Sequence, residues 1–331
     1  MGRTPQDDKG RTPQDDKGRT PQDGGVLLLC GQSRPGMPKT QHWQWYVEEF
    51  APTEQHHHAI EELFVSERSA FQQIAVLRSP VFGKMLVIDG DTQSSETDER
   101  IYHEALVHPA LAAAEDRRNI LILGGGEGAT LREVLRSPDV ARCTMVDIDE
   151  RVIDVSRKFL PEWSAGAFDD ARAEVIVGDA LEHMRVRQER YGAILSDLTE
   201  PLEDSPSNPL FNDDVFALIK SRLVEGGVYA LQASTAGVHN AALHSKMART
   251  LRRHYANVAS FFTHVPAFDT DWAFLACSDR VDLARLEAGR IDAYCARLRG
   301  ESFFYDSETH RRIFSLPLYL RRMLAAGGDT F

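Results

Sequence analysis

The feature that most constrains the fold is a regular alternation of short apolar runs and helical segments that begins at about Asn119. The apolar runs have the length of buried strands, and the segments between them space their apolar residues as helices do. The predicted strands are Asn119–Leu123, Arg142–Asp147, Glu174–Val177, Tyr191–Asp197 and Gly227–Gln232, and the predicted helices are Glu127–Arg136, Glu150–Phe159, Ala180–Arg187, Asp213–Leu223 and His239–Arg253. Such repeats predict an α/β fold in which helices cover both faces of a parallel sheet. Two later runs, Val258–Thr263 and Trp272–Cys277, predict a closing hairpin and a seven-stranded sheet.

Two segments of different composition precede this region. After Met1 the chain repeats the octapeptide GRTPQDDK, which has no aliphatic or aromatic side chain to bury. We therefore expect residues 1–40 to be a disordered tail and linker. Between residues 41 and 112, short apolar runs separated by turn residues such as Asp89-Gly90 predict a small antiparallel β domain that ends in a short helix. Residues 113–331 then form the α/β domain.

The composition narrows the range of partners. The chain has 38 Lys and Arg residues against 50 Asp and Glu residues, a net charge of −12. An acidic surface repels nucleic acid and anionic lipid and favours cationic partners, and no apolar run reaches the roughly 20 residues that span a bilayer. The four cysteines form no CxxC pair, which favours a reducing, cytoplasmic compartment. The run His56–His58 lacks the cysteine or carboxylate spacing of a metal site, so we expect no metal.

A glycine-rich loop, Gly-Gly-Gly-Glu-Gly, lies between the first predicted strand of the α/β region and its helix. Glycines at positions such as Gly124 and Gly126 allow a sharp turn and a close approach of the backbone to a ligand. Asp147 ends the next strand, where a carboxylate can bind both ribose hydroxyls, and Asp179 and Ala180 follow the third strand, where they suit an adenine amino group. The loop alone also fits a tight turn without a ligand, but three strand ends with these residues predict a nucleoside site.

The glutamate of the loop, Glu127, narrows the choice of nucleoside. A helix N-terminus usually faces a pyrophosphate or a carboxylate, and the side chain of Glu127 would repel either of them. Its charge suits a donor whose tail ends in a free amine. The alternative is that Glu127 only complements the helix dipole.

A pair of acids, Asp197 and Glu200, follows the fourth predicted strand, and Pro201 restricts the backbone after them. Paired carboxylates at a ligand-bearing strand end can bind an ammonium group and accept a proton from it. The alternative is a capping cluster that only stabilises the loop.

Together these motifs resemble those of the polyamine aminopropyltransferases, the spermidine and spermine synthase family. The resemblance covers the chain from about Trp43 to Asp279 and also includes the sequences LVIDGDTQ and YHE. It implies a methyltransferase-like Rossmann domain with a seven-stranded, mostly parallel sheet, a small N-terminal antiparallel β domain, and homodimers or homotetramers. It also implies that decarboxylated S-adenosylmethionine is the co-substrate, with no further cofactor and no metal.

The resemblance assigns roles to individual residues. By position, Asp197 matches the proton acceptor, and Gln72 matches a glutamine that contacts the donor. Tyr102 and His103 match residues that line the donor tail and the amine site. The remaining matches are the ribose acid Asp147, which is more often Glu in the family, and the adenine contacts Asp179 and Ala180.

Departures from the common spermidine synthase pattern bear on the acceptor. Glu127 stands where Asp is commoner, and the strand exit carries Glu200 in place of Asp. Together with the segment that contains Phe268 and Trp272, these two departures look more like the pattern of thermospermine synthases and related triamine or agmatine aminopropyltransferases. Phe268 and Trp272 are candidates to pack the methylenes of the acceptor, or else are core residues. We expect spermidine as the acceptor and thermospermine as the product, while putrescine and agmatine remain alternatives.

The expected mechanism is attack of an amine on the aminopropyl carbon of a sulfonium. Because alkyl amines with a pKa near ~10 are protonated at neutral pH, the amine must lose a proton. Asp197 would accept it directly or through water, Tyr102 would orient the amine, and Glu127 would anchor the donor ammonium. Glu200 with His103 would bind the distal charges of the acceptor. The rival functions are a non-catalytic polyamine or nucleoside sensor and an ordinary S-adenosylmethionine methyltransferase.

Overall fold

The computed structural model describes residues 43–51, 53–200 and 206–326. The predicted disordered tail, residues 1–40, and the predicted stiffening residue Pro201 lie outside the described residues. The described residues from Trp43 onward form one compact unit by their contacts.

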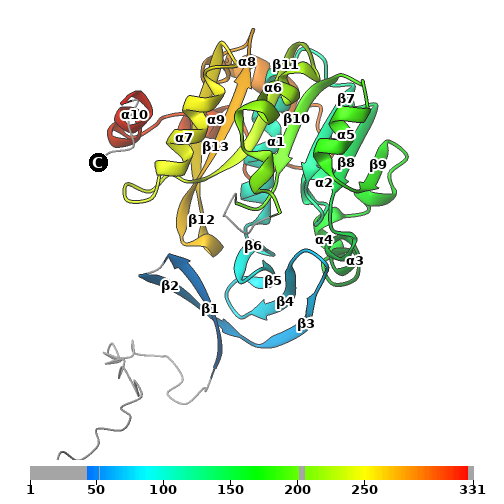
Figure 1. Cartoon of the computed structure of the whole chain (residues 1–331), viewed down its shortest axis with the longest axis vertical. Coiled ribbons are helices and arrows are strands. Elements are labelled where there is room, and N and C mark those ends of the chain that lie inside the picture. Colours follow the sequence, from blue (N-terminus) through cyan, green and yellow to red (C-terminus); the bar gives the residue numbers. More distant parts are fainter. Residues whose placement is uncertain (1–42, 52, 201–205, 327–331) are drawn as a thin grey trace, which may run out of the picture. The chain divides into compact units, whose positions relative to one another are not determined.

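A seven-stranded sheet is the centre of this unit (Figure 1). Its strands in spatial order are β12 (Asn257–Val265), β13 (Thr270–Ser278), β11 (Leu223–Thr235), β10 (Tyr191–Asp197), β7 (Asn119–Gly124), β8 (Arg142–Asp147) and β9 (Ala173–Val177). The five strands from β11 to β9 are parallel, while β13 pairs antiparallel with both β11 and β12. The prediction of a mostly parallel sheet closed by a hairpin is confirmed.

Helices cover both faces of the sheet because the buried strands are apolar on both sides. On one face the core contains side chains of α1 (Glu99–Ala113), α2 (Ala129–Leu135), α8 (Ala288–Cys295) and α9 (Ser307–Ile313). On the other face it contains side chains of α5 (Ala180–Val186), α6 (Asp213–Ser221), α7 (Ala242–Leu251) and α10 (Leu318–Ala325). Short 3₁₀ helices complete the connections: η1 (Ala167–Asp169), η2 (Asn208–Leu210), η3 (Pro266–Phe268) and η4 (Leu283–Arg285).

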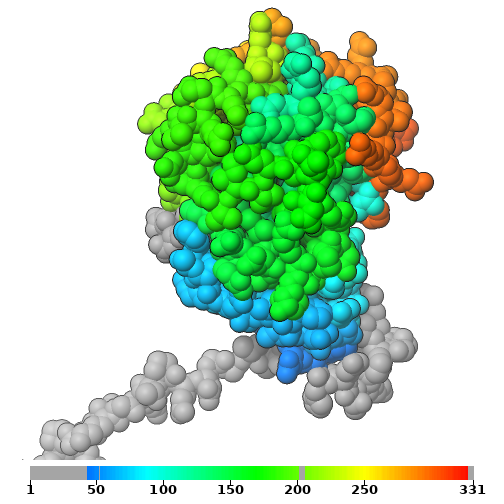
Figure 2. All heavy atoms as spheres, turned by 90° about the vertical axis from the view of Figure 1, so that its right-hand side faces the viewer, coloured from blue at the N-terminus to red at the C-terminus, as the bar shows by residue number. Residues whose placement is uncertain are grey.

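The N-terminal strands form two smaller antiparallel sheets. One has the order β3 (Glu62–Arg68), β4 (Gln73–Ser79), β5 (Gly83–Ile88) and β6 (Asp91–Ser95), and the other pairs β1 (Gln44–Ala51) with β2 (Glu54–Ile60). Apolar residues of β4 and β5, such as Ile74 and Leu86, pack against α3 (Glu150–Phe159) and α4 (Pro161–Ser164) through residues such as Val152 and Trp163. Figure 2 shows the N-terminal strands in blue directly beneath the green segments on this side of the molecule.

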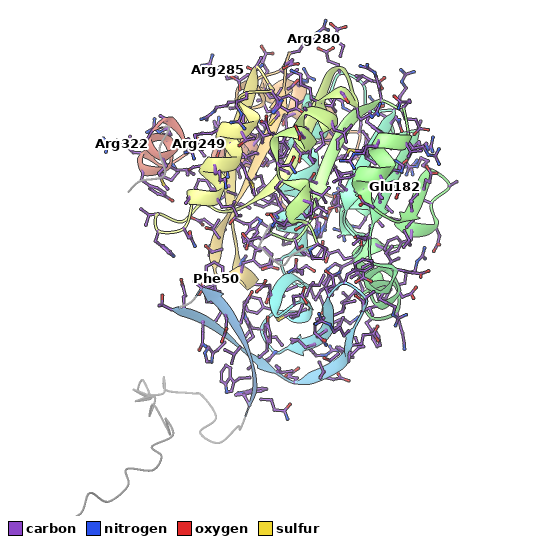
Figure 3. All side chains as sticks on the ribbon, viewed as in Figure 1. Phe50, Glu182, Arg249, Arg280, Arg285 and Arg322 are labelled. Atoms are coloured by element: carbon purple, nitrogen blue, oxygen red, sulfur yellow. The ribbon has the colours of Figure 1, made fainter. Side chains whose placement is uncertain are left out.

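This packing decides where a ligand can bind. The parallel strands β7, β8 and β10 direct their carboxyl ends towards the N-terminal strands (Figure 1). Arg280 and Arg285 project from the opposite end of the large sheet (Figure 3). In open α/β sheets ligands bind at the carboxyl ends of the strands, and here the N-terminal strands cover that edge.

Candidate functional site

A cavity of about 530 Å³ lies between the carboxyl ends of the parallel strands and the N-terminal strands. Its wall contains twelve of the thirteen residues predicted for the site, all except His103: Gln72, Tyr102, Gly124, Gly126, Glu127, Asp147, Asp179, Ala180, Asp197, Glu200, Phe268 and Trp272. The fold thus gathers residues that are up to 200 positions apart, from Gln72 to Trp272.

The glycine loop is held tightly against the end of β10. The backbone N–H of Gly125 donates to the carbonyl of Asp197 over 2.9 Å. Gly124 has a φ of +80°, and a Cβ atom there would lie 2.2 Å from the Asp197 carbonyl oxygen. Only glycine fits this position, and as a result the loop fixes the backbone that carries Asp197.

Asp147 lies at the end of β8, next to the loop. Its Oδ2 accepts from the N–H of Gly126 and its Oδ1 from the N–H of Asp149, both over 2.9 Å. Burial raises the pKa of Asp147 to about 6, with the negative charges of Asp149 and Asp197 adding to the effect, although the two N–H groups oppose it. Each oxygen accepts one backbone N–H and keeps a further lone pair that a ligand hydroxyl can use.

Two further predicted donor contacts lie beside Asp147. Gln72, 7% exposed, donates from Nε2 to Oδ2 of Asp149 over 3.0 Å, and Ser69 donates to the same oxygen over 2.6 Å. Asp179 caps α5 by accepting the N–H groups of residues 181 and 182. Asp179 thus acts as the N-cap of α5 and also lines the cavity.

Asp197 is held through both of its carboxylate oxygens. The Tyr102 hydroxyl donates to Oδ1 over 3.0 Å, and Thr130 of α2 donates to Oδ2 over 2.6 Å. Burial raises the pKa of Tyr102 well above its usual value, and the adjacent Asp197 adds to this, so that Tyr102 remains a donor. The carboxylate is fixed in orientation, and carboxylate oxygens can accept further hydrogen bonds from a ligand.

Glu127 lines the cavity, and both of its carboxylate oxygens are in contact with buried side chains behind the wall. His103 Nε2 lies 2.5 Å from Glu127 Oε1, and Ser94 donates to Oε2 over 2.6 Å. The ring of His103 is 1% exposed and is not part of the cavity wall. The predicted acceptor contact His103 therefore lies behind the wall, in contact with the predicted donor anchor.

A second group of acids, Glu48, Asp91 and Glu200, lines the cavity. Glu48 of β1 is buried and accepts from the N–H and the hydroxyl of Thr92 over 2.9 and 3.1 Å. Burial raises the pKa of Asp91 to about 6, and Glu48 and Glu200 contribute through their negative charges. Burial and the charge of Glu48 also raise the pKa of Glu200. All three carboxylates thus belong to the wall of one cavity.

Aromatic rings complete the wall. Phe268 and Trp272 are in edge contact with their centroids 5.0 Å apart, and the ring of Phe268 also meets that of Tyr102 at 6.2 Å. The indole N–H of Trp272 is buried without a hydrogen-bond partner among the described residues. Phe50 lies near the end of β1 on the side nearest the large sheet (Figure 3) and also lines the cavity. The wall thus contains aromatic rings as well as the acidic groups.

The sequence interpretation missed Glu48, Asp91, Thr130 and Asp149. Thr130 and Asp149 follow the glycine loop and β8 directly, so their positions beside a strand end were the available signal. Asp91 follows the turn Asp89-Gly90 within the sequence LVIDGDTQ, which carries the family resemblance, but no role in the site was assigned to it because the N-terminal strands meet the site only through tertiary packing. Glu48 likewise resembles a solvent-facing strand residue.

The structure also bears on metals, membranes and cysteines. Within the described ranges, no group of three or more His, Cys, Asp or Glu residues is arranged to hold a metal ion. Within those ranges, too, no helix has the length and apolarity needed to cross a bilayer. Cys143, Cys277 and Cys295 are free thiols.

Comparisons with known proteins agree with this arrangement. Residues 99–285 match the family described as spermine/spermidine synthase domain, and residues 44–96 match the spermidine synthase tetramerisation domain. A polyamine aminopropyltransferase of Sulfolobus acidocaldarius is 43% identical over 85% of this chain and 93% of its own length. One of Aeropyrum pernix is 44% identical over 86% of this chain and 91% of its own length. Among solved structures, a spermidine synthase in complex with the transition-state analogue AdoDATO matches with a TM-score of 0.80 at 25% identity, over 89% of this chain and 99% of that chain.

Proposed function

This chain belongs to the spermidine and spermine synthase family of polyamine aminopropyltransferases, and we propose that it transfers the aminopropyl group of decarboxylated S-adenosylmethionine to spermidine. The products would be thermospermine, 5′-methylthioadenosine and a proton. The alternative acceptors are putrescine, which would make the enzyme a spermidine synthase, and agmatine.

The observation that carries the proposal is that two groups of carboxylates, from two parts of the fold, line one cavity wall. Asp147, Glu127 and Asp197 lie at the glycine-loop end, while Glu48 and Asp91 belong to the N-terminal strands. Burial and the charges of Glu48 and Glu200 raise the pKa of Asp91, and an added cation would stabilise the ionised form of Asp91, so a second ammonium group is favoured beside Glu48 and Asp91. An acceptor with several amines can contact both groups.

The donor would bind along the glycine loop. Asp147 would accept hydrogen bonds from the ribose hydroxyls, and Asp179 and Ala180 would contact the adenine. Gln72 would contact the donor from the N-terminal side. Glu127 lines the cavity, and the remaining lone pairs of its carboxylate would accept hydrogen bonds from the free ammonium of a decarboxylated tail but find no donor in the carboxylate of ordinary S-adenosylmethionine.

In the chemical step, Asp197 would take a proton from the attacking amine, directly or through water. The nitrogen lone pair would then form a bond to the aminopropyl carbon while the carbon–sulfur bond breaks and its electrons go to sulfur. Tyr102 would orient the amine by way of Asp197, and Phe268 and Trp272 would pack the acceptor methylenes. Positioning of the free amine is the main demand, because a sulfonium is already a good leaving group.

Outside the site, we propose a homotetramer in the cytoplasm. The match of residues 44–96 to a tetramerisation domain supports the assembly, and the free thiols Cys143, Cys277 and Cys295 are in keeping with a reducing compartment.

Product identification tests the acceptor. The purified enzyme is incubated with decarboxylated S-adenosylmethionine and, separately, with putrescine, agmatine or spermidine, and the products are separated by a chromatographic method that resolves thermospermine from spermine. We expect thermospermine from spermidine as the preferred reaction. Preferred turnover of putrescine or agmatine would replace this acceptor, and the absence of turnover with every amine would favour a sensor. Equal use of ordinary S-adenosylmethionine would favour a methyltransferase.

A further inference from the structure

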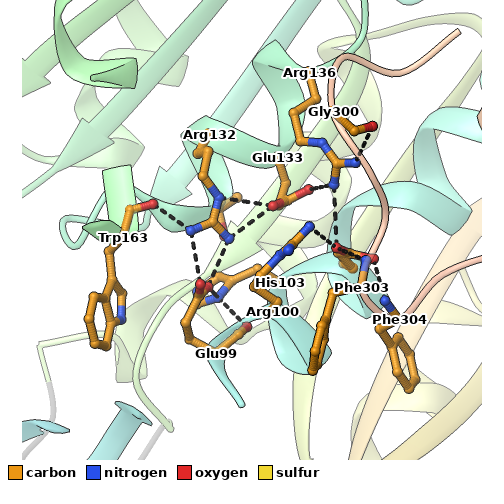
Figure 4. Close-up of polar contacts among 12 residues, drawn as sticks. Glu99, Arg100, His103, Arg132, Glu133, Arg136, Trp163, Gly300, Phe303 and Phe304 are labelled. Atoms are coloured by element: carbon orange, nitrogen blue, oxygen red, sulfur yellow. Dashed lines mark hydrogen bonds and ion pairs between the residues drawn. The ribbon is translucent and has the colours of Figure 1, made fainter. Parts of the chain in front are cut away.

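A chain of buried charged residues runs behind the donor end of the cavity, and its inner part, from His103 to Arg132, lies between helices α1 and α2 (Figure 4). From the cavity inwards it consists of Glu127, His103, Glu99 and Arg132. The residues Glu127, Glu99 and His103 are 8%, 7% and 1% exposed, so the chain is almost completely removed from water. We call these four residues the relay.

The contacts of both His103 ring nitrogens favour its charged form. Nδ1 lies 2.6 Å from the Glu99 carbonyl oxygen and 3.1 Å from Glu99 Oε2, while Nε2 lies 2.5 Å from Glu127 Oε1. Both ring nitrogens therefore face oxygens, and a carbonyl oxygen can only accept. An imidazolium, which has a hydrogen on each nitrogen, satisfies all of these contacts.

The contact at the other carboxylate oxygen of Glu127, Oε2, agrees with an imidazolium at His103 and an ionised Glu127. Trp163 Nε1 can only donate, and it donates to Ser94 Oγ over 2.9 Å. The Ser94 hydroxyl in turn donates to Glu127 Oε2 over 2.6 Å. Glu127 Oε2 thus accepts a hydrogen bond, and an imidazolium that donates to Oε1 leaves Glu127 an ionised carboxylate.

Arg132 fixes the inner end of the relay. Its Nη1 and Nη2 donate to the two carboxylate oxygens of Glu99 over 2.9 and 2.8 Å, and Nη1 also donates to the Trp163 carbonyl over 2.7 Å. Burial raises the pKa of Glu99, but hydrogen bonds from His103 and Arg132 outweigh it and leave the pKa below its usual value. A bidentate guanidinium pair of this kind holds the carboxylate in one orientation.

Further charged and titratable groups face His103. Asp197 Oδ2 lies 4.0 Å from Nε2, Asp98 interacts with the ring electrostatically, and the phenol of Tyr102 meets the imidazole edge-on with centroids 5.0 Å apart. Burial lowers the pKa of His103, but the charges of Glu127 and Asp197 and the hydrogen bonds to Glu127 and Glu99 outweigh it and raise the pKa well above its usual value.

We propose that Glu99 and Arg132 are positioning residues that keep His103 as an imidazolium, which in turn fixes the Glu127 carboxylate at the donor end and places a positive charge beside Asp197. The link to catalysis rests on the proposed role of Glu127 in donor binding. The His103–Glu127 pair is neutral as a unit, so Asp197 is not forced to lie next to an uncompensated second carboxylate. Repulsion between two close carboxylates would otherwise favour protonation of one of them.

The protonation of His103 tests the relay without any reference to turnover. In protein labelled with ¹⁵N-histidine, the His103 ring signals are assigned by their loss in His103→Gln. We expect both ring nitrogens of the wild type to remain protonated at pH values above about 7, where an ordinary histidine is neutral. A wild-type His103 that is neutral at about pH 7.5 would overturn the proposal.

Variants then test the part played by Glu99. In Glu99→Gln, His103 should lose its proton at a lower pH than in the wild type, and kcat/KM for the donor should fall about 10- to 100-fold, the usual effect of losing a charge-assisted hydrogen bond. Glu99→Asp keeps the charge and should recover part of both properties. If the variants show wild-type His103 titration and a wild-type pH profile of kcat/KM, the positioning role is wrong.

Arg136 offers a matched control in the same pair of helices. It forms buried ion pairs with Glu133 at 2.6 Å and Glu104 at 3.3 Å but does not contact His103 or Glu99 (Figure 4). Glu133 also accepts from Arg132 over 2.9 Å, so Arg136 lies two contacts outside the relay. Arg136→Gln should lower the Tm without changing the His103 titration. An equal change in that titration would show a general effect of buried charge and would contradict a relay. The variant Glu127→Gln separates the relay from the proposed function. If this variant binds the donor as tightly as the wild type, while His103 of the wild-type protein is protonated as expected, only the proposed role of Glu127 in donor binding is refuted.

Discussion

Asp197 receives a hydrogen bond at each oxygen, one from Tyr102 and one from Thr130. Both donors come from helices, α1 and α2, that are packed against each other in the core. The side chain proposed as the base is therefore held by rigid elements, which limits the loss of entropy when an amine is aligned with it.

Removal of the proton acceptor gives the first prediction. Asp197→Asn keeps the shape of the side chain but cannot accept a proton, so kcat should fall about 10²- to 10⁴-fold, the range of general-base catalysis. Steady-state assays with saturating donor and acceptor measure it, and calorimetric binding of 5′-methylthioadenosine serves as the folding control. A kcat near the wild-type value would show that another group accepts the proton.

The raised pKa of Asp147, about 6, predicts a pH dependence of nucleoside binding. An ionised carboxylate accepts hydrogen bonds from ribose hydroxyls better than a protonated one, so affinity should fall as the pH drops through 6. If only the ionised form binds, the Kd for 5′-methylthioadenosine should be about tenfold higher at pH 5 than at pH 8. Calorimetric titrations over this range measure the change.

Asp91 provides the control for that prediction, because its pKa is also raised to about 6 but it belongs to the other acidic group. Asp147→Asn should remove the pH dependence of 5′-methylthioadenosine binding, and Asp91→Asn should retain it.

The raised pKa of Asp147 affects folding in the opposite direction to ligand binding. Since the folded chain binds the Asp147 proton more tightly than the unfolded chain, this group's contribution to stability decreases as the pH rises from about 4 to about 6.

At the scale of elements, the turn between β7 and α2 joins the sheet to the site. Gly124→Ala should destabilise the fold by at least about 1–3 kcal/mol, because alanine is strained at this positive φ and its Cβ would overlap the Asp197 carbonyl. Chemical denaturation measures the free energy of unfolding. Gly289→Ala in helix α8 is the control: the added Cβ meets no atom within 4 Å, and the change should stabilise by up to about 1 kcal/mol. Equal effects of the two changes would show that the turn has no special requirement for glycine.

The elements of the large sheet could be predicted because their signals are local. Strands such as β8, which matches the predicted Arg142–Asp147, combine apolar runs with turns at their ends. The prediction was less accurate at β11, which begins at Leu223 and not at Gly227, because Gly226 takes a positive φ within the strand and does not end it. From the sequence alone, a glycine can mark either the end of a strand or an irregularity within it.

The parts that could not be predicted depend on tertiary contacts. The acids Glu48 and Asp91 are brought to the cavity by the packing of the N-terminal strands on α3 and α4, and the sequence contains no pairing rule for such distant segments. The burial of His103 behind Glu127 had the same cause. Its place in the YHE sequence indicated a site residue, but which way its ring faced depended on Glu99 and Arg132.

At the scale of the whole molecule, the N-terminal strands present apolar side chains on the face of β1 opposite to Glu48. Trp45 and Val47 alternate with the less exposed Tyr46 and Glu48 and are 55% and 41% exposed, and Leu63 on β3 is 58% exposed. β1 and β3 belong to the two different N-terminal sheets, and large apolar side chains that face solvent are typical of an interface between protein chains. Because these residues lie within the match to a tetramerisation domain, we expect this face to be covered by a second copy of the chain.

The double substitution Trp45→Lys with Leu63→Lys tests this expectation. Charges placed in an apolar interface lose hydration without gaining partners, so the assembly should dissociate from a tetramer to smaller species in light scattering after size-exclusion chromatography. The control Val186→Lys changes an apolar residue of 69% exposure on α5, outside the tetramerisation match, and should leave the tetramer intact. Since Glu48 lies on the other face of the same strand as Trp45, dissociation should also raise KM for the acceptor more than KM for the donor. An unchanged mass would place the interface elsewhere, and dissociation with both KM values unchanged would show that β1 holds its cavity face without the partner copy.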